Sequence, residues 1–201
     1  MRFDEAAATW DEGPARQERS RLLAQELIPI IQTNNLKTGL DFGAATGLLS
    51  VYLMDHLEDI TLVDVSEGMV REAGRKIKQL EAKNIEAHHQ DLLAEPLSRK
   101  YDILYTLMTL HHIRDTERAL SVFYNHLRPG GYCCIADLDQ EDGSFHAEFP
   151  DFDGHNGFDQ RALKVLMEKV GFTAVHSHIF FSIEQNGRQY PLFLMVGKRL
   201  H

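Results

Sequence analysis

The chain has 201 residues, of which 43% are hydrophobic and 25% are charged. This composition excludes disordered and fibrous proteins, and the length suffices to bury a core without help from a metal or a disulfide. A formal net charge of -9 also lacks the basic character expected of a general nucleic-acid binder.

The first predicted elements are two helices. A short one covers residues 3–10, Gly13-Pro14 interrupts the chain, and a longer helix carries apolar residues at helical spacing from Leu22 to Ile31. Pro29 should kink this second helix or end its regular part, because proline removes a backbone donor and crowds the preceding turn. Residues 1–35 are therefore predicted to form a helical cap.

From residue 39 onward, short apolar runs alternate with longer periodic stretches, which is typical of a mostly parallel sheet with helices on both faces. Ser66 can cap the helix after the second strand, and the predicted buried stripe of that helix includes Leu80. Residues 128–131 have the composition of a turn. The strands predicted in this part of the chain are 39–42, 60–64, 85–90, 101–107 and 132–138.

The C-terminal part is predicted to add antiparallel strands to this sheet. A segment without a clear period, 139–157, precedes a helix over 159–170. Two β runs near 173–183 and 190–198 flank Asn186-Gly187, and Asn-Gly is the strongest short hairpin signal. The predicted fold is α/β, doubly wound and Rossmann-like, with seven strands, helices on both faces and an antiparallel C-terminal hairpin.

Small or acidic residues follow the predicted strands at the edge where doubly wound sheets bind ligands. In the turn from Asp41 to Gly47, Gly43 allows a tight turn and the close approach of a ligand. Asp64 ends the second strand about 20 residues further on, where a carboxylate can accept from ribose hydroxyls. Asp91 follows the third strand. Each feature alone also fits an ordinary strand–helix turn, a helix cap or a surface acid.

The turn after the first strand argues against two classes of phosphate ligand. The dinucleotide fingerprint needs glycine where this chain has Ala45 and Leu48, and the glycine-rich loop of P-loop proteins is missing too. The sequence therefore disfavours a nicotinamide oxidoreductase and favours a ribose-bearing ligand without phosphates.

These residues resemble the class I S-adenosylmethionine-dependent methyltransferases. The matching motifs lie in the right order along essentially the whole chain, which we expect to be a single domain over residues 1–201. They are Asp41-x-Gly43-x-x-Thr46-Gly47, Asp64, Asp91, Leu110-His111-His112-Ile113 and Leu127-Arg128-Pro129-Gly130-Gly131. The opening from Phe3 to Asp11 is similar to the N-terminal helix of small-molecule methyltransferases of the ubiquinone-biosynthesis type. Ala45 departs from the pattern, since many members have glycine there.

The resemblance implies S-adenosyl-L-methionine as the cofactor and S-adenosyl-L-homocysteine as the product. It places the turn after the first strand at the methionine end, Asp64 at the ribose and Asp91 at the adenine amine. It also implies that the first helix closes over the site. The implied cofactor-binding residues are Trp10, Asp41, Gly43, Ala44, Ala45, Gly47, Asp64, Val65, Met69, Gln90, Asp91, Leu92, Thr106 and Leu107.

Two histidines are candidates for chemistry at the methyl acceptor. Methyl transfer from a sulfonium is an in-line displacement, so a general base is needed only if the acceptor must lose a proton. His111 follows the fourth strand and should lie near the methyl group, and His146 is the second predicted catalytic residue. We expect His112 to pack or to cap.

Residues 139–158 are predicted to form a lid over the acceptor. Long loops in compact domains are usually functional or disordered, and Phe145, Phe149 and Phe152 argue against disorder. The alternative is a solvated acidic loop. His146, Asp151 and His155 could supply metal ligands, but their spacing matches no known site, so we expect no metal.

The function predicted from the sequence is methyl transfer from S-adenosylmethionine to a small molecule. The alternative is a catalytically silent cofactor-binding subunit that supports a partner enzyme. We expect no nucleic-acid partner, no membrane partner, and a monomer or homodimer. No leader or long apolar run is seen, and the adjacent Cys133 and Cys134 should point to opposite faces of a strand and stay reduced, which predicts a cytoplasmic protein.

Overall fold

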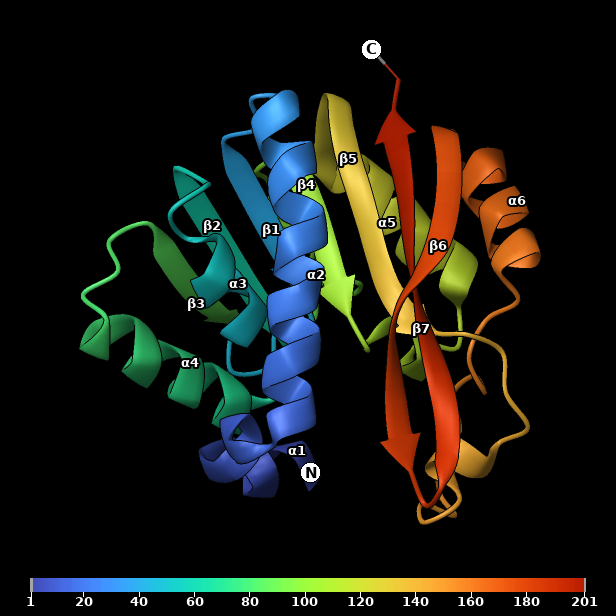
Figure 1. The fold of residues 1–201 in the computed structure, drawn as a ribbon. Coiled ribbons are helices and arrows are strands. Elements are labelled where there is room, and N and C mark those ends of the chain that lie inside the picture. The colour runs from blue at the N-terminus through green and yellow to red at the C-terminus, as the bar shows by residue number, and fades with distance from the viewer. Residues whose placement is uncertain (1, 201) are drawn as a thin grey trace.

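The computed structural model describes residues 2–200 and contains a seven-stranded sheet in the order β3-β2-β1-β4-β5-β7-β6 (Figure 1). Strands β1 to β5 pair in parallel, whereas β7 pairs antiparallel with both β5 and β6. The strands are β1 (Thr38–Phe42), β2 (Asp59–Asp64), β3 (Ile85–His89), β4 (Tyr101–Leu107), β5 (Leu127–Leu138), β6 (Phe172–Gln185) and β7 (Arg188–Arg199). The predicted fold class is confirmed.

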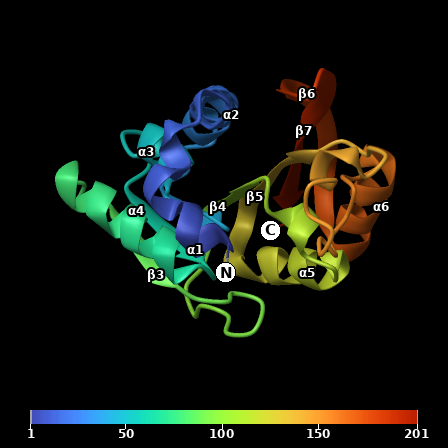
Figure 2. The ribbon, with the colours of Figure 1, turned by 90° about the horizontal axis from the view of Figure 1, so that it is seen from below.

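The helices form a layer on each face of this sheet (Figure 2). Helices α2, α3 and α4 lie on one face, and α5 and α6 lie on the other. The bounds are α1 (Arg2–Ala6), η1 (Ala7–Glu12), α2 (Pro14–Thr33), α3 (Leu48–Leu53), α4 (Glu67–Gln79), η2 (Leu110–His112), α5 (Thr116–His126), η3 (Ser144–His146) and α6 (Gln160–Val170). Among the described residues, no helix has both the length and the hydrophobicity needed to cross a bilayer.

Two hydrophobic cores result from the alternation of side chains along the strands. Leu104 and Cys133 pack with α5 and α6, whereas Tyr105 and Cys134, one residue further on, pack with α2, α3 and α4. Both cysteines are buried and free, as predicted. A fully buried side chain such as Leu27 contributes about 1.5–3 kcal/mol to stability, so both faces help to hold the sheet in place.

Most predicted helix and hairpin signals act as expected. The Oγ atom of Ser66 accepts a hydrogen bond from the Met69 backbone nitrogen, and Asp115 and Asp159 cap α5 and α6 in the same way. Asn186-Gly187 forms the turn between β6 and β7, and both residues have positive φ angles.

Two local predictions are wrong, and a third is wrong in one of its two alternatives. Helix α2 does not end at Pro29 but continues to Thr33, and Leu27 and Ile31 on either side of the proline are buried in the core. Residues 128–131 belong to β5, where Gly130 has φ +81° and the register against β4 shifts, so the glycines form an irregularity within the strand. Leu80, predicted on the buried stripe of α4, is 45% exposed because the helix ends at Gln79.

The carboxyl edge of the parallel strands is flanked by two additions. Helix α1 and the adjoining η1 pack against α4 at one side of this edge. At the other side, the β6–β7 hairpin extends past the end of β5, together with the segment that contains η3 (Figure 1). Any ligand at the carboxyl edge would therefore lie between these two additions.

Candidate functional site

The turn after β1 has three residues in the left-handed region. Gly43, Ala45 and Gly47 have φ angles of +66°, +49° and +74°. A Cβ atom on Gly43 would lie 2.2 Å from the Cγ2 atom of Thr109, so only glycine fits there. The Oγ1 atom of Thr109 donates to the Gly43 carbonyl at 3.3 Å, which ties the end of β4 to this turn.

Asp64 at the end of β2 joins the same turn. Its two carboxylate oxygens accept from the backbone nitrogens of Ala45, at 2.7 Å, and Ser66, at 2.8 Å. Burial raises the pKa of Asp64, although these backbone N–H groups oppose the shift. The structure thus brings together two of the predicted site residues, Ala45 and Asp64, from neighbouring strand ends.

The carboxylate of Asp41, by contrast, points into the core. It is 2% exposed and accepts from the Oγ atom of Ser50 at 2.7 Å, and that oxygen also lies 2.7 Å from the Tyr105 hydroxyl. Burial raises the pKa of Asp41 to about 7, against the opposing hydrogen bond from Ser50. Through Ser50, Asp41 links β1 to α3 and β4. Its carboxylate therefore points into the core, although the sequence resemblance implied a contact with the cofactor.

The end of β3 lies next to the end of β2. The backbone nitrogen of Gln90 donates to the Asp64 carbonyl at 3.0 Å, and Leu92 is buried. Asp91 is exposed and accepts from the Leu93 backbone nitrogen at 2.9 Å, so its carboxylate caps the following turn. The remaining predicted cofactor-binding residues lie around these strand ends, where Met69 and Thr106 are buried, Val65 is 53% exposed, and Ala44 and Leu107 are half-buried.

The N-terminal segment is fastened to these turns by two acids of its motif, Asp4 and Asp11, whose contacts were not predicted from the sequence. One oxygen of Asp4 accepts from the Ser66 hydroxyl at 2.7 Å and from the Gly68 backbone nitrogen at 2.8 Å. Asp11 accepts from the Thr46 hydroxyl at 2.5 Å and pairs with Lys76. Their partners are 35 to 65 residues away, so no local spacing pointed to them.

Trp10 is held in the same segment by its neighbours. The Arg16 guanidinium lies 4.1 Å from the centre of the Trp10 ring, and Phe3 packs edge-on at 5.9 Å. Phe3 also packs edge-on against His112, at 5.6 Å between ring centres. The N-terminal segment therefore reaches the residues that follow β4.

A buried carboxylate orients His111. The Nδ1 atom of His111 lies 2.6 Å from one oxygen of Asp137, and the His111 backbone nitrogen donates to the other oxygen at 3.1 Å. Both side chains are at most 1% exposed. Burial alone would raise the pKa of Asp137, but the charge of His111 and hydrogen bonds from His111 and Leu138 outweigh it and lower the pKa. Asp137, which sequence reasoning also missed, leaves Nε2 of His111 available for a ligand.

Two further histidines gather around His111. The ring centre of His112 lies 4.2 Å from that of His111, and the ring centre of His146 lies 5.1 Å from it. Burial lowers the pKa of His112 and of His146 to about 4, and the proximity of His111 adds to both shifts. The structure thus joins the predicted catalytic pair, His111 and His146, and adds His112 as a third member.

Residues 139–158 fold over these histidines. The backbone nitrogen of His155 donates to the His111 carbonyl at 2.7 Å, and the Phe152 ring stacks on His146 at 3.7 Å. The His155 ring lies within hydrogen-bond distance of Thr116 and the Ile113 carbonyl, so it fixes the segment to the start of α5. Among the described residues, the histidine group that could hold a metal includes neither His155 nor Asp151, so the trio considered from the sequence is not assembled.

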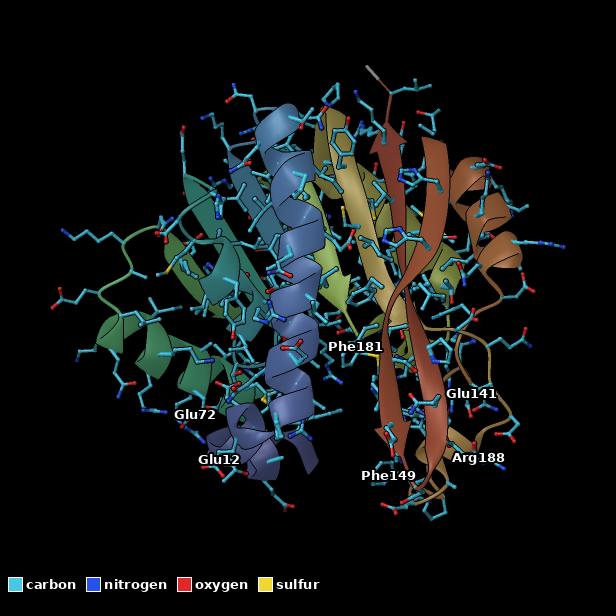
Figure 3. All side chains as sticks on the ribbon, viewed as in Figure 1. Glu12, Glu72, Glu141, Phe149, Phe181 and Arg188 are labelled. Atoms are coloured by element: carbon cyan, nitrogen blue, oxygen red, sulfur yellow. The ribbon has the colours of Figure 1, made fainter. Side chains whose placement is uncertain are left out.

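The beginning of this segment, residues 141–144, is fixed to the β6–β7 hairpin. Arg188 pairs with Asp142 at 2.9 Å, and the Ser144 hydroxyl lies 2.9 Å from the Tyr190 hydroxyl. Figure 3 labels Glu141 and Arg188 at this end of the hairpin, and the Ser144 hydroxyl lies within hydrogen-bond distance of both side chains. The segment is therefore bound at both ends around the histidine group.

Comparison with known proteins gives one family. Residues 14–177 match the family model described as a methyltransferase domain. An uncharacterized methyltransferase of Schizosaccharomyces pombe is 26% identical over 178 residues, which cover 79% of this chain and 63% of that protein. Phosphoethanolamine N-methyltransferase 1 of Arabidopsis thaliana is 25% identical over 153 residues, covering 72% and 31%. The chain thus spans less than two thirds of the length of either relative.

Solved structures share the fold. The N-methyltransferase NodS of Bradyrhizobium japonicum, in complex with S-adenosyl-L-homocysteine, superposes with a TM-score of 0.73 at 17% identity, over 95% of this chain and 90% of that one. A chain from the complex between the Haloferax volcanii Trm112 methyltransferase activator and a methyltransferase gives a TM-score of 0.79 at 16% identity, over 99% and 98%. At these identities the likeness establishes the architecture.

Proposed function

Since the chain belongs to the methyltransferase-domain family, we propose that it transfers the methyl group of S-adenosylmethionine to a small-molecule acceptor at the carboxyl edge of its sheet. The observation that carries this proposal is the hydrogen bond that the Ala45 backbone nitrogen donates to the Asp64 carboxylate. It places an acid and a turn with three positive φ angles at adjacent strand ends, where doubly wound sheets bind nucleosides and a strand-end acid can accept from the ribose hydroxyls.

The residues present fit this cofactor. The turn after β1 leaves room for close approach because Gly43 and Gly47 have no side chain, and the half-buried carboxylate of Asp64 can exchange its backbone partners for ribose hydroxyls. The Oγ1 atom of Thr106, in the same region, is buried and has no hydrogen-bond partner among the described residues. Such an unpaired group is stabilised when a polar ligand binds beside it.

The remaining assigned residues would complete the cofactor site. Trp10 would close over it together with the N-terminal segment that Asp4 and Asp11 fasten in place. Met69 and Val65 would flank the adenine, and Asp91 would reach its amine, which requires the carboxylate to leave its bond with Leu93.

The acceptor would bind between the N-terminal segment and residues 139–158. When bound, S-adenosylmethionine supplies a methyl group on a positively charged sulfur that is an excellent leaving group. The chain's own contribution is orientation and the exclusion of water, worth about 7–11 kcal/mol when reactants are well aligned. Asp137 holds His111 so that Nε2 can take a proton from an acceptor that must lose one, and His146 lies beside it.

Two features support a small acceptor. The net charge of -9 disfavours nucleic acid, and aromatic rings surround the histidines, with Phe3 against His112 and Phe152 against His111. Curated relatives include the phosphoethanolamine methyltransferase of Arabidopsis and a ubiquinone biosynthesis O-methyltransferase of Coxiella burnetii, which is 26% identical over 134 residues.

Calorimetry and a turnover screen test this function. Purified protein is titrated with S-adenosylhomocysteine, and production of this compound from S-adenosylmethionine is measured over a panel of small oxygen, nitrogen, carbon and sulfur acceptors. We expect binding at one site per chain and turnover with one acceptor class. A folded protein that does not bind S-adenosylhomocysteine overturns the proposal, and binding without turnover over the whole panel favours the silent-subunit alternative.

A further inference from the structure

The three histidines beside the acceptor region have the geometry of a metal site. One ring nitrogen from each of His111, His112 and His146 lies within 4.8 Å of the others. In a tetrahedral zinc site with metal–nitrogen bonds of about 2.0–2.1 Å, ligand nitrogens lie about 3.4 Å apart. To bind one ion, the three ring nitrogens would have to approach one another from within 4.8 Å to about 3.4 Å.

The carboxylate of Asp137 supplies the outer contact that metal-binding histidines usually have. It holds Nδ1 of His111 at 2.6 Å, which directs Nε2 away from it as the free nitrogen. Histidines that bind a metal almost always donate their second nitrogen to a carboxylate, a carbonyl or water, and this contact raises the basicity of the ligand. His111 is therefore prepared as a ligand before any ion arrives.

His146 carries an unpaired nitrogen at this place. The residue is 8% exposed, and among the described residues its Nδ1 atom has no hydrogen-bond partner. A buried polar atom without a partner costs about 1–3 kcal/mol, so a ligand that binds this nitrogen would be favoured. Stacking on Phe152 holds the ring in position, with only 7° between the two planes.

The charges around the group are compatible with a cation. Asp137, Asp153 and Glu141 all act on these histidines. Arg114 pairs with Asp153, and the partly buried Arg19 lies close enough to Asp137 to interact with its charge. The net charge of the groups around the three histidines is therefore not positive. Three neutral imidazoles in this surrounding can bind a divalent ion.

We propose that His111, His112 and His146 bind one divalent transition-metal ion, with Zn²⁺ as the best match, and leave its fourth position open to the methyl acceptor. Three nitrogen ligands and an open position are typical of a catalytic zinc site, whereas Mg²⁺ and Ca²⁺ prefer oxygen ligands. The sequence expectation of no metal is revised by this proposal.

The role of the ion rests on the proposed methyl transfer. An acceptor oxygen, nitrogen or sulfur bound at the open position would lose its proton to solvent, because the ion stabilises the anion. The bond from methyl carbon to sulfur then breaks as the bond from carbon to the acceptor atom forms, and the electron pair stays on sulfur as S-adenosylhomocysteine leaves. With the ion on Nε2, His111 acts as a ligand and no longer takes the proton itself.

Metal titration tests the site without any acceptor. Chelator-treated protein is titrated with Co²⁺ and with Zn²⁺ alone, with calorimetry for stoichiometry and visible absorption of Co²⁺ for geometry. We expect one ion per chain, an intense four-coordinate Co²⁺ spectrum, and loss of both in His112→Ala and in His146→Ala. His176→Ala, which removes an exposed histidine on β6, serves as the matched control and should bind like the parent.

Asp137→Asn tests the outer contact, and we expect metal affinity to fall about 10- to 100-fold while the stoichiometry stays the same. Zinc-edge X-ray absorption of the parent protein provides evidence that needs no variant, since three imidazoles should appear as neighbours of the ion. Absence of tight Co²⁺ and Zn²⁺ binding in the parent, or unchanged binding in both His112→Ala and His146→Ala, overturns the site. Titration with S-adenosylhomocysteine separates this result from the proposed function, because that ligand can bind with or without the ion.

Discussion

Two parts of the carboxyl edge differ in construction: the ends of β1, β2 and β3, where we propose that the cofactor binds (the cofactor side), and the ends of β4 and β5, where we propose that the acceptor binds (the acceptor side). On the cofactor side, backbone turns and strand-end acids meet through bonds such as that between Asp64 and Ala45. On the acceptor side, Asp137 at the end of β5 meets His111 in η2, and His146 joins them only because residues 139–158 fold over η2.

This difference suggests a division of labour. The cofactor side depends on backbone geometry that many sequences can produce, so it suits a ligand shared by a whole family. The acceptor side depends on side chains and on one individual loop, so it suits a ligand specific to this chain. Variants on the two sides should therefore separate binding of S-adenosylhomocysteine from turnover.

The largest effect is expected for His111→Gln on the acceptor side. We expect turnover with the acceptor found in the screen to fall about 10²–10⁴-fold, because the proton acceptor or metal ligand is lost. S-adenosylhomocysteine affinity, measured by calorimetry, should stay within a few-fold. His178→Gln, at an exposed position on β6, is the control. Full activity in His111→Gln would remove this residue from the chemistry.

A pH-dependent effect is expected for Asp41 beneath the cofactor side. Its pKa is raised from 3.8 to about 7, so the folded state binds more protons than the unfolded state between these values, and the contribution of Asp41 to stability falls as pH rises through this window. Asp41→Asn should therefore gain stability over the parent as pH rises from 4 to 8, by up to about 4 kcal/mol.

Urea unfolding at several pH values measures this difference. Asp55→Asn, which changes an exposed carboxylate, should show no such gain. If the stabilities of Asp41→Asn and the parent run parallel from pH 4 to 8, the buried carboxylate does not titrate as stated.

Asp64→Ala should act on the cofactor side alone. Loss of hydrogen bonds to a charged group costs about 1.5–3 kcal/mol, so affinity for S-adenosylhomocysteine should fall about 10- to 100-fold. Asp59→Ala provides the control, because Asp59 begins the same strand at the opposite edge of the sheet and pairs with Arg99. Equal affinities of Asp64→Ala and the parent would contradict the assignment of the ribose.

The smallest effects are expected for two glycines in α4. A Cβ atom on Gly68 would lie 2.8 Å from the Cα atom of Asp4, so Gly68→Ala should displace the N-terminal segment and weaken S-adenosylhomocysteine binding several-fold. Gly74→Ala meets nothing within 4 Å and should stabilise the helix by about 0.5–1 kcal/mol with unchanged binding. Identical binding by the two variants would show that the N-terminal segment does not contribute to the site.

The sequence by itself determined the order of the strands, the Ser66 cap and the strand-end acids, because these depend on residues close together in the chain. Local patterns predict the cap at Ser66, the hairpin turn at Asn186-Gly187 and the succession of strands β1 to β5. They also predict that Cys133 and Cys134 lie on opposite faces of the sheet. The same local rules failed at Pro29 and at residues 128–131, where core packing and strand pairing outweighed propensity.

Only the tertiary structure decided which side chains meet. Asp4 and Asp11 in the N-terminal segment bind Ser66 and Thr46 in the turns after β2 and β1, and Asp137 lies 26 residues from the histidine that it orients. His112 joins His146 because a loop without sequence period closes over η2. Such contacts depend on the path of the whole chain, which local spacing does not encode.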